Sequence, residues 1–155
     1  FTSFYLLLAG FTQFNPFIRN KYRQLHRFMG WSYAFILICF SAPSGLVMGY
    51  HANGGISSRL AFILLGLLWI YATVQSIRYA LKKEWKKHER FMIRSYALTL
   101  SAITLRLWKY LIVAFFHPPP MDVYRIVAWL GWVLNIIVAE CIIYAAENSD
   151  KKIFH

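Results

Sequence analysis

Acidic residues are scarce in this sequence. Asp and Glu number 6 against 17 Lys and Arg, which gives a formal net charge of +11. Such an excess can indicate nucleic-acid binding. Here, however, the positive charges lie in short segments between apolar runs, which is the pattern of a multi-pass membrane protein. The charge distribution therefore argues against nucleic acid as a partner.

Cysteines and familiar catalytic motifs are also few or missing. The two cysteines, Cys39 and Cys141, lie far apart in apolar segments and in no metal-ligand spacing, so we expect both to be buried. The chain has no GxGxxG, Walker, CxxCH or HExxH pattern and no serine nucleophile elbow. The sequence therefore indicates no catalytic residue and contains no flavin or nicotinamide domain.

Apolar residues dominate what is present. Hydrophobic side chains make up 59% of the 155 residues, more than a soluble domain of this size can bury. They fall into five segments, at about 1–14, 28–50, 60–80, 91–116 and 123–146. Crossing a bilayer takes roughly 20 residues, so the last four can span it, and the first resembles a transmembrane helix without its outer part. We expect one all-α integral membrane domain over residues 1–155.

The basic segments predict the orientation of this bundle. Residues 15–27 and 78–90 hold most of the positive charge, and such segments remain on the cytoplasmic side of a membrane. The helices that follow them, at 28–50 and 91–116, should then run parallel, from inside to outside. The C-terminus should be cytoplasmic.

Ionisable residues inside apolar segments are costly to insert into a membrane and usually face a partner. At about 1.5 Å per residue, Arg94 and Glu140 reach similar depths, which predicts an ion pair between the fourth and fifth segments. Arg106 is 18 residues from His88, or five helical turns, so the two should share a face that points into the bundle. Asn135 is close enough in depth to bond to Arg106. The alternative interpretation is that these residues only hold the helices together.

Histidines mark both ends of the second and fourth segments. His26 and His88 lie at one end, His51 and His117 at the other. Imidazole is a common axial ligand of haem iron, so His26 and His88 could hold a b-type haem at their shared depth. The outer pair could in principle do the same. Histidines at helix ends are also ordinary interfacial residues.

Three stretches carry a resemblance to a known family. They read "RQLHRFMG" from Arg23, "KHERFMIRSYALTLSAITLRLW" from Lys87 and "WLGWVLNIIVAE" from Trp129. The chain resembles the mostly bacterial integral membrane proteins of domain of unknown function 2306. That resemblance implies a helical fold and a place in the bacterial cytoplasmic (inner) membrane, but no agreed activity.

Three functions are compatible with these residues. The first is a non-catalytic accessory subunit, packed in lipid against other subunits of a larger respiratory or photosynthetic complex that carries pigments or cofactors. The second is a membrane electron carrier that binds haem b or quinone, with His26 and His88 as ligands and with Arg94 and Arg106 near propionates or carbonyls. The third is a small transporter, with Arg106, Glu140 and Asn135 lining a cavity.

Overall fold

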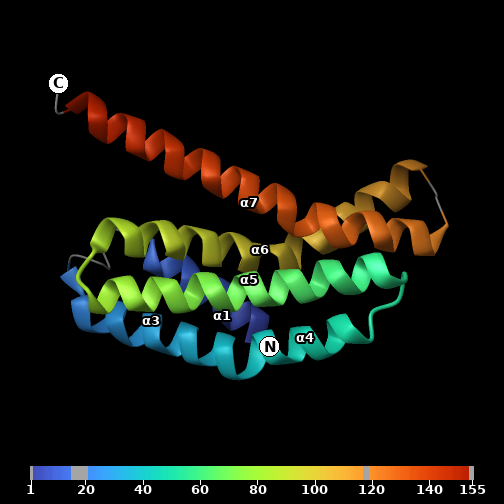
Figure 1. Ribbon diagram of the computed structural model, residues 1–155, viewed down its shortest axis with the longest axis horizontal. Helices are drawn as coiled ribbons and strands as arrows, with labels where there is room; N and C mark the ends of the chain where they lie inside the picture. Colours follow the sequence, from blue (N-terminus) through green and yellow to red (C-terminus); the bar gives the residue numbers. More distant parts are fainter. Residues whose placement is uncertain (1, 15–20, 117–118, 154–155) are drawn as a thin grey trace.

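The computed structural model describes residues 2–14, 21–116 and 119–153. Every secondary-structure element in these ranges is a helix (Figure 1). The elements are α1 (Thr2–Gln13), α3 (Arg23–Ile36), the π-helix η1 (Leu37–Ser41), α4 (Ala42–Tyr50), α5 (Ile56–Leu81), α6 (Trp85–Phe116) and α7 (Pro120–Ile153). The predicted all-α transmembrane bundle is confirmed. His117 lies outside the described residues, so the outer histidine pair is not described.

Four stretches are long and apolar enough to cross a membrane. They are Arg23–Tyr50, Ile56–Leu81, Trp85–Phe115 and Met121–Asn148, and they correspond to the four long segments predicted from hydropathy. The helices begin earlier or end later than the predicted segments, because hydropathy detects only the apolar part of a helix that continues into charged residues. α6, for example, begins at Trp85 instead of residue 91.

The first long span contains a change of helix type. Pro43 lacks a backbone N–H and its ring crowds the carbonyl four residues earlier, which disfavours a regular α-helix. The wider π-helical turn of η1 lies immediately before α4 and accommodates this break. The chain then turns at Gly54 and Gly55, whose φ angles of +97° and +83° suit glycine. This is the tight loop between α4 and α5.

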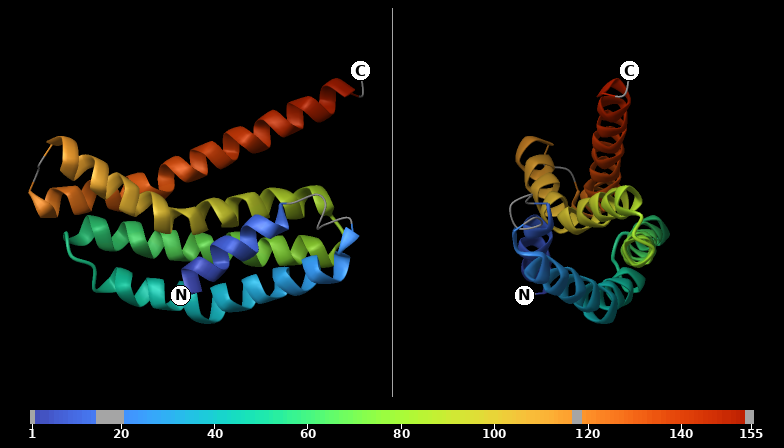
Figure 2. Two further views of the ribbon diagram at one scale, coloured as in Figure 1. Left: turned by 180° about the vertical axis from the view of Figure 1, so that it is seen from behind. Right: turned by 90° about the vertical axis from the view of Figure 1, so that its left-hand side faces the viewer.

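α1, the continuous span of α3, η1 and α4, α5 and α6 form a ring, and α7 lies outside it. α1 packs against α3 and α6, α5 packs against α4 and α6, and α7 packs mainly on α6 (Figure 2). The side chains of Leu6, Tyr33 and Leu37 meet inside the ring and are almost fully buried. The C-terminal half of α7 diverges from the bundle as a long arm (Figure 1). We call the end where α3 and α6 begin the basic end.

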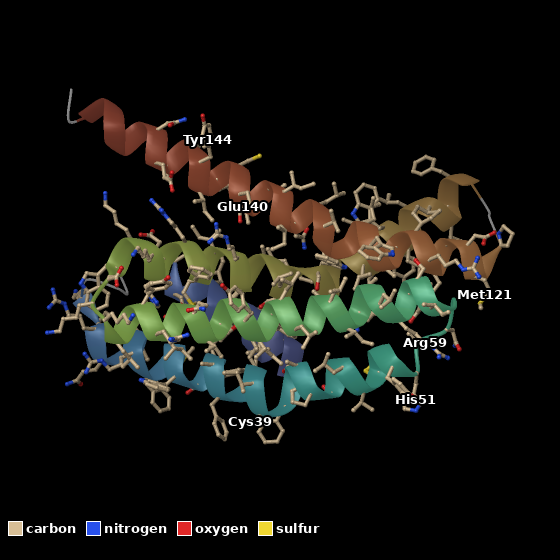
Figure 3. The ribbon with its side chains drawn as sticks, viewed as in Figure 1. Cys39, His51, Arg59, Met121, Glu140 and Tyr144 are labelled. Carbon is tan, nitrogen blue, oxygen red and sulfur yellow. The ribbon has the colours of Figure 1, made fainter. Side chains whose placement is uncertain are left out.

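The prediction that both cysteines are buried is wrong. Both Cys39 and Cys141 are exposed on the protein surface, and Figure 3 labels Cys39 on the span of α3 and α4. Small apolar residues are buried in soluble proteins because water surrounds the fold. In a membrane span the surrounding solvent is lipid, so an apolar segment does not predict burial.

Candidate functional site

A cluster of hydroxyl groups occupies the middle of the ring. The Tyr33 hydroxyl lies 2.7 Å from Thr99 Oγ1 and 3.0 Å from Ser95 Oγ. Thr73 Oγ1 lies 2.7 Å from Ser95 Oγ, and Trp69 Nε1 donates to Thr99 Oγ1 at 3.1 Å. The cluster, which we call the hydroxyl cluster, joins α3, α5 and α6 at one depth.

The two threonine protons of the hydroxyl cluster are committed to backbone carbonyls. Thr99 Oγ1 donates to the Ser95 carbonyl, and Thr73 Oγ1 donates to the Trp69 carbonyl. Each threonine oxygen can therefore only accept from its other neighbours. Because Trp69 is a donor alone, the chain of bonds ends there. This arrangement suits a brace between helices better than a path for protons.

His88 lies two turns from Ser95 on α6, at the basic end. Its Nδ1 is 2.9 Å from the carbonyl oxygen of Ser76 and 2.9 Å from the Ser76 hydroxyl. A carbonyl only accepts, so Nδ1 carries a hydrogen, and in the neutral ring Nε2 has the lone pair. His26 is part-buried on α3 at the same end, and its carbonyl accepts a bond from Gln13 Nε2. A shared haem iron between these histidines stays a prediction.

A groove of about 290 Å³ lies between α6 and α7 at the basic end. We call it the α6–α7 groove; its lining residues are Lys87, Arg90, Phe91, Arg94, Glu140, Ile143, Tyr144 and Glu147. Lysine and arginine side chains come from α6, and the two carboxylates come from α7. The divergence of the α7 arm leaves the groove open, and Figure 3 labels Glu140 and Tyr144 one turn apart on that arm.

Two ion pairs cross the groove. Arg94 Nε donates to Glu140 Oε1 at 2.5 Å and Arg94 Nη2 to Glu140 Oε2 at 2.9 Å. The predicted Arg94–Glu140 ion pair is thus present, in the bidentate geometry that arginine favours. One turn nearer the basic end, Arg90 Nη2 lies 2.7 Å from Glu147 Oε1. The Arg94 guanidinium also lies 5.0 Å from the Phe91 ring centre.

The prediction for Arg106 and Asn135 is wrong. Asn135 Nδ2 donates to the Ala97 carbonyl at 3.1 Å and to Thr104 Oγ1 at 3.0 Å, not to Arg106. Arg106 itself is exposed, although Ser95 and Thr99, which lie between His88 and Arg106 on α6, are buried. The second half of α6 leaves the ring and crosses α7 (Figure 1), so the face that is internal at Ser95 has no helix opposite it at Arg106.

Sequence reasoning missed Tyr33, Trp69 and Thr73 in the hydroxyl cluster. The available signal was Trp69 in the middle of its apolar segment at 60–80, because tryptophan normally gathers at membrane interfaces. It also missed the Arg90–Glu147 pair, which depends on α7 continuing beyond its apolar part. The α6–α7 groove contains Glu140 but neither Arg106 nor Asn135, so it does not unite the three residues of the transporter hypothesis.

Comparison with known proteins identifies the family of the chain. A stretch of 61 residues is 41% identical to the "Ava biosynthesis cluster protein G" of Aspergillus versicolor; it makes up 37% of this chain and 18% of that protein. The match therefore covers less than a fifth of the relative's length. No solved structure matches the chain. The model of the DUF2306 family, described as predicted membrane proteins, matches residues 1–143. The chain belongs to the DUF2306 family of predicted membrane proteins.

Proposed function

We propose that this chain is a non-catalytic accessory subunit that packs, within the membrane, against another integral membrane protein. Arg106 is the observation that carries the proposal. It is exposed on α6 ten residues before the helix ends at Phe116, and it has no hydrogen bond or ion pair with any residue that the structure describes. Ten residues correspond to about 15 Å of helix.

An unpaired arginine at that depth is costly in hydrocarbon. Insertion scales assign roughly 2.5–3.5 kcal/mol to arginine at the centre of a membrane helix, and such residues usually face a partner group or a water-filled cavity. A carboxylate or several carbonyl oxygens on a neighbouring subunit would remove most of this cost. The surrounding side chains Ile103, Leu107 and Tyr110 are exposed and apolar, which suits the same contact. The competing explanation is that Arg106 extends toward lipid headgroups.

The experiment compares Arg106→Leu with Lys109→Leu, an exposed lysine three residues further along the same helix. In the purified chain, Arg106→Leu should leave stability unchanged or raise it, because it breaks no internal contact. In native membranes it should release the chain from its complex on blue native gels, whereas Lys109→Leu should not. Retention of the complex by Arg106→Leu would reject the proposal.

Proximity labelling provides a second test of the same contact. With Cys39→Ser and Cys141→Ser in place, a photo-crosslinker attached at Ile103→Cys should yield one product of defined mass. The control position is the exposed native Cys39 in a chain that carries only Cys141→Ser. Addition of Arg106→Leu should abolish that product. Equal crosslinking from Cys39 would indicate non-specific collisions in the bilayer.

Membrane orientation belongs to this proposal. The basic end holds Arg23, Arg27, Lys82, Lys83, Lys86 and Lys87, all exposed, so we assign it and the C-terminus to the cytoplasmic side of a bacterial inner membrane. Arg23→Cys and Lys86→Cys should react with an impermeant maleimide from the cytoplasmic side, and Arg59→Cys from the other. Labelling of Arg23→Cys and Lys86→Cys on opposite sides would contradict the assignment.

A haem- or quinone-binding carrier is the second candidate function. The observation in its favour is the Nδ1 bond of His88 to Ser76, because ligating histidines commonly fix their other nitrogen in this way. A reduced-minus-oxidised visible spectrum of the purified protein tests for haem, and quinone extraction tests for the alternative. A b-type band that His88→Ala and His26→Ala each abolish would favour this function over the accessory role.

A further inference from the structure

We infer that the α6–α7 groove binds the headgroup of an anionic phospholipid, with the acyl chains lying along the open side beneath the α7 arm. The inference concerns a different surface from Arg106 and does not depend on the subunit proposal. It rests on the charge, the lining and the opening of the groove.

Charge complementarity identifies the headgroup. Five basic residues lie within nine positions at the connection of α5 and α6 and the first turns of α6: Lys82, Lys83, Lys86, Lys87 and Arg90. A cluster of four to eight basic residues beside a membrane helix, or a basic pocket between such helices, is typical of binding to anionic lipid. Among the side chains that the structure describes at this end, Glu84, Glu89 and Glu147 oppose these five cations, so positive charge is in excess beside the groove.

The ion pairs define which cations remain available. Arg94 is bound by both oxygens of Glu140, one turn further from the basic end than Arg90. Arg90 contacts Glu147 through Nη2, and its guanidinium has five N–H donors in all, so it can still bind a phosphate. Lys87 lies at the mouth, paired with Glu84 at 2.6 Å, and its side chain is 55% exposed. Lys87 and Arg90 are therefore the cations that we assign to the phosphate.

The apolar side of the groove suits acyl chains. Phe91 and Ile143 line it from opposite helices, and Ile137, about one turn before Glu140 on α7, is apolar and exposed. Because the arm diverges from the ring (Figure 2), the groove opens sideways, where the membrane span predicts lipid. A charged mouth above an apolar flank matches an amphiphile with a headgroup and long chains.

The test titrates delipidated protein in micelles with phosphatidylglycerol or phosphatidylcholine and counts bound lipids by native mass spectrometry. The unsubstituted chain should prefer phosphatidylglycerol. Lys87→Gln with Arg90→Gln should weaken its binding roughly 10- to 30-fold, from the usual contribution of two basic residues at a membrane surface. The matched control is Arg23→Gln with Arg27→Gln, which removes the same charge from the start of α3; binding should change less than twofold.

Glu147→Gln separates a binding site from a purely structural ion pair. It removes the carboxylate that competes for Arg90, so binding of phosphatidylglycerol should become stronger, whereas Arg90→Gln weakens it. If the pair served only to hold α7, both substitutions would act in the same direction. The inference would be overturned if the two double variants lost phosphatidylglycerol binding equally. It would also be overturned if the unsubstituted chain bound phosphatidylcholine as well as phosphatidylglycerol. Circular dichroism and size exclusion confirm that each variant is folded.

Discussion

The hydroxyl groups of Tyr33 and Thr99 lie 2.7 Å apart between α3 and α6. Both side chains are almost fully buried, at 1% and 2% exposure. Their helices do not otherwise pack closely, because α1 and α5 separate them around the ring. A single tyrosine thus provides the polar contact across the centre of the bundle, and this makes it the most informative position for stability.

Tyr33→Phe should destabilise the protein by about 1–2 kcal/mol. The substitution keeps the ring but removes the hydroxyl, which leaves the oxygens of Thr99 and Ser95 short of a partner in an apolar interior; hydrogen bonds between membrane helices contribute roughly 0.6–1.7 kcal/mol. Unfolding in mixed micelles by SDS measures the effect. Tyr110→Phe is the control, because Tyr110 is 75% exposed and should change stability by less than about 0.5 kcal/mol.

A loss of the same size in both variants would mean that the Tyr33 hydroxyl contributes nothing specific. Ser95→Ala provides a further check, because Ser95 contacts both Tyr33 and Thr73. Its effect should be smaller than the sum when combined with Tyr33→Phe, since the two residues share one set of bonds.

The sequence predicted those features that depend on one helix or on depth alone. Hydropathy located the spans, and a fixed rise per residue brought Arg94 level with Glu140. Arg106 was misplaced because its surroundings depend on where α6 leaves the ring, which no periodicity encodes. Tyr33 was missed because its partners, Ser95 and Thr99, are 62 and 66 positions away. Cys39 was misjudged because a lipid-facing surface is as apolar as a core.

Arg94 and Glu140 should show strong coupling in a double-mutant cycle. Arg94→Met leaves a carboxylate within the span, Glu140→Met leaves a guanidinium, and the double variant leaves neither charge. Each single substitution should therefore cost more than the double one, with a coupling of about 1–3 kcal/mol. Arg125 and Asp122 are the control pair, 3.8 Å apart and more than half exposed, where coupling should be at most about 0.5 kcal/mol.

Additive effects at Arg94 and Glu140 would contradict this expectation. They would indicate that each charge reaches water or headgroups when its partner is removed. The SDS-unfolding measurement used for Tyr33 serves here as well, because the charges affect the junction of α6 with the α7 arm.

Gly131→Ala should weaken the crossing of α6 and α7. A Cβ at Gly131 would lie 2.5 Å from Leu105 Cγ and 3.2 Å from the Leu105 Cα, so the backbones must separate. Separation would also stretch the bond from Thr104 Oγ1 to the Gly131 carbonyl, now 2.6 Å. Overpacking of this kind costs about 1–3 kcal/mol.

Gly45→Ala is the matched control for Gly131, since both glycines lie inside membrane helices. Nothing lies within 4 Å of a Cβ at Gly45, and alanine is the better helix former by roughly 1 kcal/mol, so this variant should be as stable as the unsubstituted chain or more so. Because the crossing at Gly131 holds the start of the arm, Gly131→Ala should also weaken phosphatidylglycerol binding in the α6–α7 groove, and Gly45→Ala should not. Equal stability of the two variants would show that α7 adjusts freely against α6, and the arm could not then hold a groove of fixed shape.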